Sequence, residues 1–177
     1  MMLRKKSAAW IITAVFMVLS LFLGAWGSYG AKRRDAADVF NEIAMPHILQ
    51  ATVPAFNIQT VATRYLSPAD MTILNIGGIV DRILHARDPA DIFEYYLQLY
   101  FALEDAVLLL HNTDMSESNQ NFINTYHRNF LDADRILRQS GYNRTAEEFN
   151  NALGSNLGFI VRIVVREMPR FDVDIDD

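Results

Sequence analysis

The sequence contains no cysteine among its 177 residues. This absence excludes disulfide bonds, thiolate metal sites and a cysteine nucleophile, although it does not fix the cellular compartment. The chain also has no glycine-rich phosphate loop and no serine-centred nucleophile elbow. We therefore predict no catalytic residue, no cofactor and no metal site, and we do not expect an enzyme.

Lysine is nearly absent as well, and the few lysines are unevenly distributed. Lys5, Lys6 and Lys32 are the only ones in the sequence. Residues 35–177 carry ten arginines and all 21 acidic residues, which gives this part of the chain a net charge of −11. An acidic body of this kind repels the phosphates of nucleic acids, so we do not expect a nucleic acid as a partner.

The four histidines do not have the spacing of metal ligands. None of them follows a glutamate by three residues, and the sequence has no His-x-x-x-His pair. Asp172, Asp174 and Asp176 alternate like the start of a calcium loop, but the glycine and glutamate that such a loop requires do not follow. We interpret residues 171–177 as an acidic tail.

What the chain does have is an uncharged, largely apolar run over residues 7–31. As an α-helix with a rise of about 1.5 Å per residue, this run spans about 37 Å, which exceeds the roughly 30 Å of bilayer hydrocarbon. Trp10 and Trp26 lie near its ends, where aromatic side chains meet the membrane surface. Basic residues flank the run on both sides: Arg4, Lys5, Lys6, Lys32, Arg33 and Arg34. We predict a basic tail (1–6) and a single transmembrane anchor (7–31) in contact with the lipid bilayer of the cell membrane.

A cleaved signal peptide is the alternative interpretation of this run. Ala25-Trp26-Gly27 loosely fits a small-x-small cleavage site. The length of the apolar run and the basic cluster after it favour a retained anchor. The basic charges on the two sides are nearly balanced, so the positive-inside rule gives only a weak orientation. We expect the soluble body to lie outside the cytoplasm, as in a signal-anchor whose charged start stays inside.

The remainder of the chain, residues 32–170, shows helical periodicity. Two similar start signals, Ser67-Pro68-Ala69-Asp70 and Asp88-Pro89-Ala90-Asp91, each combine a capping side chain, a proline at the first helical position and an aspartate at the third. Apolar residues at spacings of three and four predict the helices, with a break or loop over 45–54 around Pro46 and Pro54. The predicted ranges are 31–44, 55–66, 68–87, 89–111, 116–140 and 142–153. The run 158–167 fits either a strand or a helix, and we favour a helix. The prediction is an all-α fold, with a transmembrane helix followed by an antiparallel helical bundle.

The same periodicity predicts which side chains face inward. Phe56 belongs to the inward face of the helix over 55–66. One side of the helix over 116–140 carries Phe122, Tyr126, Phe130, Ala133, Ile136 and Leu137. The aromatic residues of 93–101 encircle their helix, so they cannot all face one core. Packing against two neighbouring helices is the favoured account of these rings, and contact with a partner is the alternative.

The stretch 120–150 contains Asn121-Phe122, Arg135-Ile136 and two aromatic-Asn steps seven residues apart, Tyr142-Asn143 and Phe149-Asn150. With these pieces it resembles the second half of the LemA family, membrane-anchored bacterial proteins with an antiparallel helical bundle. Seven residues are about two helical turns, so both aromatic-Asn steps fall on one face. The chain lacks the family's basic-acidic-Leu-Ile-Pro-Asn-Leu-Val signature and the Phe-Pro step after the second pair. The resemblance implies a fold and an anchor, but no activity, because the family has no established common enzymatic activity.

Taken together, these patterns predict a membrane-anchored protein of the bacterial cell envelope. Its helical bundle is expected to bind protein partners or itself, without catalysis. The alternative is a small-ligand sensor module of the cell envelope. The residues expected to matter are the anchor flanks (Trp10, Trp26, Lys32, Arg33, Arg34) and the family-like motif (Tyr142, Asn143, Phe149, Asn150).

Overall fold

The computed structural model describes residues 2–155, 161–162 and 165–171, and within these ranges every regular element is a helix and none is a strand. The prediction of an all-helical chain is therefore confirmed. In chain order the elements are α1 (Met2–Val39), the π-helical turn η1 (Phe40–Ala44), α2 (Met45–Tyr65), α3 (Pro68–Leu74), α4 (Ile76–His85), α5 (Pro89–His111), α6 (Glu117–Arg138) and α7 (Tyr142–Leu153).

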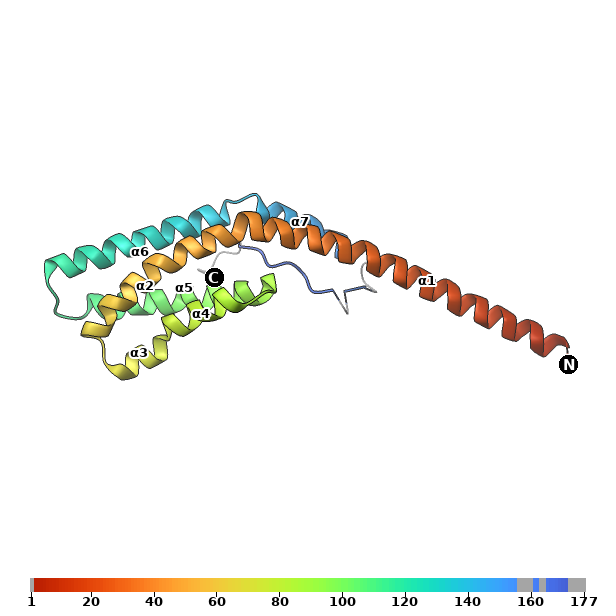
Figure 1. Cartoon of the computed structure of the whole chain (residues 1–177), viewed down its shortest axis with the longest axis horizontal. Coiled ribbons are helices and arrows are strands. Elements are labelled where there is room, and N and C mark those ends of the chain that lie inside the picture. Colours follow the sequence, from red (N-terminus) through yellow and green to blue (C-terminus); the bar gives the residue numbers. More distant parts are fainter. Residues whose placement is uncertain (1, 156–160, 163–164, 172–177) are drawn as a thin grey trace.

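Helix α1 extends far beyond the rest of the molecule, with the N-terminus near its free end (Figure 1). Among the described residues, one helical run, Ile12–Tyr65, contains an 18-residue window with a mean hydropathy of 1.7, and none of that window is buried. Eighteen helical residues rise about 27 Å, close to the roughly 30 Å of bilayer hydrocarbon, so by length and composition this helix can cross a membrane.

The π-helical turn η1 follows from the spacing of buried side chains. Ala36, Phe40, Ala44 and Ile48 are all buried and lie four residues apart. In an α-helix each step of four residues advances about 40° beyond a full turn, so three such steps would rotate the buried face by about 120°. The wider turn, closed by a bond from Met45 N–H to Phe40 O, absorbs this surplus rotation. The four side chains therefore remain on one face of a continuous helix.

The predicted break over 45–54 is wrong, because α2 runs through both prolines. Pro46 lies in the first turn of α2, directly after the wide turn, and Pro54 lies inside the helix. A proline inside a helix costs about 3 kcal/mol. Burial of one face of α2 offsets this cost, since each large apolar side chain buried contributes about 1.5 to 3 kcal/mol. The fully buried residues of this face are Ile48, Ala51, Ala55, Ile58 and Ala62.

Both predicted helix starts are present. Ser67 Oγ accepts a hydrogen bond from Asp70 N (3.2 Å), and Asp88 Oδ1 accepts one from Ala90 N (2.9 Å). The single helix predicted over 68–87 is instead divided into α3 and α4 at Asn75, whose φ is 42°. Asparagine is one of the few residues that adopt this left-handed conformation readily, and the apolar periodicity of 68–87 does not mark Asn75 as a breakpoint.

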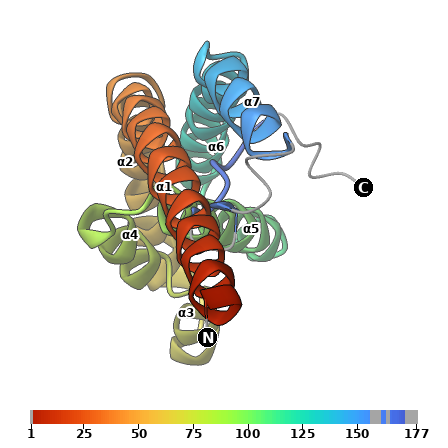
Figure 2. The same ribbon diagram turned by 90° about the vertical axis from the view of Figure 1, so that its right-hand side faces the viewer.

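The helices after α1 gather into one body, in which α2 packs chiefly against α6 and α5, and α4 against α5. Helix α7 lies beside the C-terminal part of α1 (Figures 1 and 2). Three side chains predicted to face inward, Phe56, Phe122 and Ile136, are exposed, while Ile123 is fully buried. On α6 the predicted residues Phe130, Ala133 and Leu137 are buried, so the predicted orientation is wrong only at Phe122 and Ile136. The choice between helix and strand for 158–167 falls mostly outside the described residues.

Candidate functional site

The family-like motif residues lie on one face of α7, as their spacing predicts. Tyr142, Asn143 and Phe149 are buried, and Asn150 is half-buried. Three of the four side chains converge on the same target, the irregular segment Met168–Phe171. This target was not predicted, because nothing in the sequence connects α7 with a segment some twenty residues further along.

The contacts between α7 and this segment are hydrogen bonds to the main chain. Asn150 Nδ2 donates to Met168 O (2.8 Å), and Asn150 Oδ1 accepts from Met168 N (2.8 Å). Asn143 Oδ1 accepts from Phe171 N (2.9 Å), and Tyr142 Oη donates to Pro169 O (2.8 Å). We call this arrangement the backbone clamp, formed by Tyr142, Asn143 and Asn150. It satisfies the polar groups of a segment that belongs to no helix or strand.

Phe171 anchors the clamped segment in the core. Its side chain is only 3% exposed. Its ring centroid lies 5.0 Å from that of Phe93, 5.8 Å from that of Tyr142, 5.9 Å from that of Tyr96 and 6.3 Å from that of Phe40. The sequence pattern predicted that Phe171 belongs to an acidic tail, whereas in the structure it is a core residue whose ring is in contact with three elements, η1, α5 and α7.

A buried charged group joins α5, α6 and the clamped segment. Asp134 is 6% exposed and accepts hydrogen bonds from Tyr96 Oη (2.9 Å) and Arg138 Nε (2.6 Å). Arg138 Nη1 also donates to Phe171 O (3.2 Å). Burial, together with the neighbouring carboxylate, raises the pKa of Tyr96, so this hydroxyl stays protonated and acts as a donor. The carboxylate is therefore buried with two donors around it, as a buried charge requires.

Asp134 was missed in the sequence. A usable signal was present, because Phe130, Ala133 and Leu137 mark the buried arc of α6 and Asp134 lies within that arc. An acidic residue at such a position needs a cationic partner, and Arg138 is one helical turn further on.

The predicted anchor flanks have different environments. Arg33 Nη2 lies 2.8 Å from Asp88 Oδ2, so it connects the end of the apolar run with the start of α5. Burial raises the pKa of Asp88, but the hydrogen bond from Ala90 N–H and the Arg33 guanidinium outweigh this effect and hold the pKa below its usual value. Lys32 Nζ lies 5.7 Å from the ring centroid of Tyr29. Trp10, Trp26 and Arg34 are exposed on α1.

Tyr29, inside the predicted anchor, also connects α1 with the body. Its hydroxyl donates to Ala152 O (3.2 Å) at the end of α7. Together with the Arg33–Asp88 ion pair, this bond holds the body against α1 directly after the apolar run. No flexible linker separates the two parts.

The outer face of α2 carries a row of apolar side chains. Leu49, Val53 and Phe56 are exposed, and Thr60 and Thr63 continue the row with the same spacing of four and three. Thr60 Oγ1 donates to Phe56 O and Thr63 Oγ1 donates to Thr60 O, each at 2.9 Å, so both hydroxyls are satisfied within the helix. We call these five residues the α2 stripe. Residues 43–63 contain no Asp, Glu, Lys or Arg, so the stripe is also free of charge.

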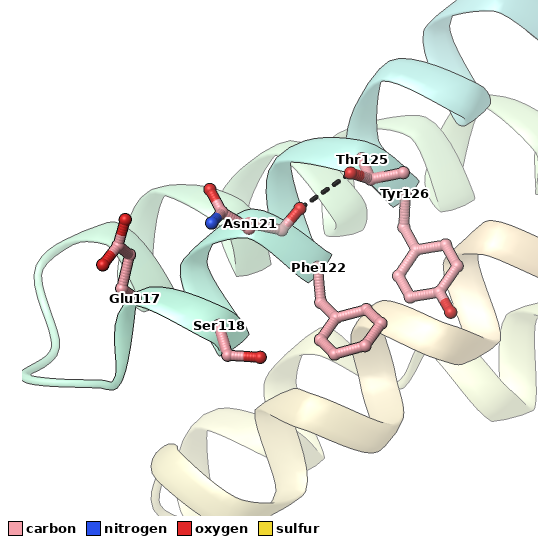
Figure 3. A pocket seen from close by; sticks show the side chains of 6 residues that line it. All are labelled: Glu117, Ser118, Asn121, Phe122, Thr125 and Tyr126. Carbon is pink, nitrogen blue, oxygen red and sulfur yellow. Dashed lines mark hydrogen bonds between the residues drawn. The ribbon is translucent and has the colours of Figure 1, made fainter.

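Two surface depressions lie near the stripe or at the end of the body. The first, of about 440 Å³, lies between α2 and α6 and is lined in part by Val53 and Ile136. The second, of about 510 Å³, is lined by α6 residues alone, including the stacked rings of Phe122 and Tyr126 (Figure 3). Both depressions are open to solvent, so neither would surround a bound small molecule. A depression built from one helix offers contact from one side only.

The histidines do not form a site. His127 Nε2 contacts Glu104 Oε1 (2.7 Å), and His111 Nε2 contacts Asn124 Oδ1 (3.0 Å). Within the described part of the chain, no group of three or more His, Asp or Glu side chains could hold a metal ion.

The structure thus brings Tyr142, Asn143 and Asn150 together around the segment Met168–Phe171. Phe149, the fourth residue of the motif, lines a depression together with the anchor flank Lys32. Comparison with protein families, curated proteins and solved structures finds no match to this chain. Any assignment of function therefore depends on the physical features of the chain itself.

Proposed function

We propose that this chain is a single-pass membrane protein of the bacterial cell envelope whose helical body binds protein partners or itself, without catalysis. The long, apolar, exposed helix α1 supports the anchor, and the basic residues on both sides of its apolar run are typical of a membrane-spanning segment.

We also propose that the body lies outside the cytoplasm. Protease added to intact, wall-stripped cells should then digest the body, and a body that is cleaved only after lysis would reverse this orientation.

The observation that carries the binding proposal is the α2 stripe. The body is strongly acidic, and yet one face of α2 presents a row of apolar side chains without a single charge. Isolated exposed apolar residues are ordinary, but a contiguous row of them is typical of a surface that contacts another protein. The satisfied threonine hydroxyls strengthen this interpretation, because they leave no polar group that needs water.

We also propose a LemA-like antiparallel arrangement for the body. Tyr65, at the end of α2, contacts Asn119, at the start of α6, through a side-chain hydrogen bond. Val53 in the middle of α2 shares a depression with Ile136 near the end of α6. These two contacts support helices that run in opposite directions, and the motif on α7 supports the family resemblance.

Affinity capture from detergent-solubilised membranes tests the binding proposal. The full-length wild-type chain should be compared with Val53→Glu and Leu108→Glu. The two side chains are 60% and 62% exposed, on α2 and α5 respectively, so the variants add the same charge at equally exposed positions. We expect Val53→Glu to lose the captured proteins, whether other proteins or further copies of this chain, and Leu108→Glu to keep them. Identical capture by both variants contradicts the proposal. A metabolite that co-purifies without any protein favours the small-ligand sensor.

A further inference from the structure

We propose that the α2 stripe is a self-association surface, at which α2 of one copy packs in parallel against α2 of a second copy in the same membrane. This inference rests on the proposed function, since it names the protein that the body binds. It follows from the charge, the spacing and the direction of α2.

The distribution of charge on the body favours a second copy of the chain as the partner of the α2 stripe. Two bodies that each carry a net charge of −11 repel one another wherever their acidic faces meet. The α2 stripe itself contains no acidic or basic residue, and along the sequence the flanking charges, Glu42 and Arg64, lie beyond its two ends. Asp132 of α6 lines the depression beside Val53, but its carboxylate is paired with Arg135 at 2.7 Å. Two copies can therefore approach along this face without bringing unpaired like charges into contact, and each copy buries apolar area that is otherwise exposed.

The spacing of the stripe fits a helix as its partner. Leu49, Val53, Phe56, Thr60 and Thr63 follow one another at intervals of four, three, four and three residues. This is the spacing of a single seam between two helices that cross at a small angle. The threonine hydroxyls are bonded to their own helix, so their methyl groups complete an apolar seam. No side chain of the stripe brings an unsatisfied donor or acceptor into the contact.

The anchor sets the direction of the pair. Helix α2 continues α1 through η1 without a loop (Figure 1). Two copies with α1 in one bilayer therefore point their α2 helices in the same direction. A closed pair of identical chains then has its twofold axis along the membrane normal, and each stripe residue lies opposite the same residue of the other copy.

The absence of cysteine makes this arrangement directly testable, because any introduced thiol is the only one in the chain. Full-length chains with Val53→Cys or Thr60→Cys, expressed together as two differently tagged copies, should be treated in membranes with a short bismaleimide crosslinker. We expect an adduct that carries both tags for each variant. Leu108→Cys, with the same exposure on α5, should give little or no such adduct.

A charge in the stripe provides the second measurement. Adding Val53→Glu to the Thr60→Cys chain should lower the yield of doubly tagged adduct by about tenfold or more, since like charges that face each other across an interface oppose association strongly. Adding Leu108→Glu to the same chain should leave the yield unchanged. Both positions are exposed, and circular dichroism should show that both variants remain helical.

The outcomes separate this inference from the proposed function. Adducts that contain another protein but not both tags overturn the second copy as occupant and leave protein binding in place. An adduct yield that Val53→Glu does not change also overturns the pairing through α2. The proposed function itself fails only when affinity capture is the same for Val53→Glu and Leu108→Glu.

Discussion

Asn150 holds both backbone polar groups of Met168, with its amide nitrogen 2.8 Å from the carbonyl oxygen and its amide oxygen 2.8 Å from the backbone nitrogen. One side chain thus provides the two hydrogen bonds that a neighbouring strand would otherwise supply. The body is completed in this way by a segment that has no secondary structure of its own. The stability of the clamped segment should depend on a small number of side chains.

Replacing Asn150 with alanine should destabilise the body. The change leaves the N–H and C=O of Met168 without their partners, and unpaired groups of this kind cost about 1 to 3 kcal/mol. Asn151→Ala is the matched control, because Asn151 is exposed on the same helix and should change the free energy of unfolding by less than about 0.5 kcal/mol. Chemical denaturation in detergent measures both. Equal stability of the two variants contradicts the role of the clamp.

Truncation of Phe171 should lower the free energy of unfolding more than the replacement of Asn150 does. Phe171→Ala leaves a cavity among four aromatic rings and should lower the free energy of unfolding by about 3 to 5 kcal/mol. Phe101→Ala removes an exposed ring and should cost less than about 1 kcal/mol. In the double variant Asn150→Ala/Phe171→Ala, the loss should be smaller than the sum of the single losses, because both residues hold the same segment. Strict additivity would show that they act independently.

The ion pairs of α6 should differ in their contribution to stability. Asp134→Asn removes the charge that partners the largely buried Arg138 and should cost about 3 kcal/mol. Asp132→Asn removes a partner of the exposed Arg135 and should cost at most about 1 kcal/mol. Thermal unfolding of the two variants under identical conditions checks this difference. A loss for Asp132→Asn as large as that for Asp134→Asn would contradict it.

Acid should weaken the attachment of α1 to α5. The pKa of Asp88 is lower in the folded chain than in the unfolded one. Its contribution to stability is therefore fully present above the unfolded pKa of about 3.9 and is lost as the pH falls through the folded pKa. The other acids titrate in both proteins, so the difference in unfolding free energy between wild type and Asp88→Asn isolates this residue. That difference should be constant above about pH 5 and should shrink below about pH 4. A difference that stays constant down to the acid limit contradicts the Arg33–Asp88 attachment.

Local signals predicted the helices well where a cap or an uninterrupted seam was present. The starts at Ser67 and Asp88 and the whole of α5 follow from capping chemistry and periodicity. Proline was misleading, because Pro46 and Pro54 read as breaks when only the local preference is considered. Their helix persists because one face of α2 is buried by α5 and α6, and no local rule contains that information.

The candidate site was predicted only in part. The sequence placed Tyr142, Asn143 and Asn150 on one face of a helix, and the structure confirms that placement. Their target could not be deduced, since a contact between α7 and Met168–Phe171 depends on the tertiary path of the chain. The buried side of α6 was predicted at Phe130, Ala133 and Leu137 but missed at its start, where Phe122 is exposed and Ile123 is buried. These two apolar residues are adjacent and differ by about 100° around the helix, so the periodicity alone does not decide between them.

The unbroken passage from α1 into α2 has a consequence for the reach of this protein. From residue 32 to Tyr65 the backbone rises by about 1.5 Å per residue, or about 50 Å in total. Tyr29 and Arg33 hold the body against the start of this helical segment, so no flexible linker lets the body move away from it. In the proposed anchored state, the body therefore lies within about 50 Å of the bilayer surface, and a partner has to come within that distance to bind.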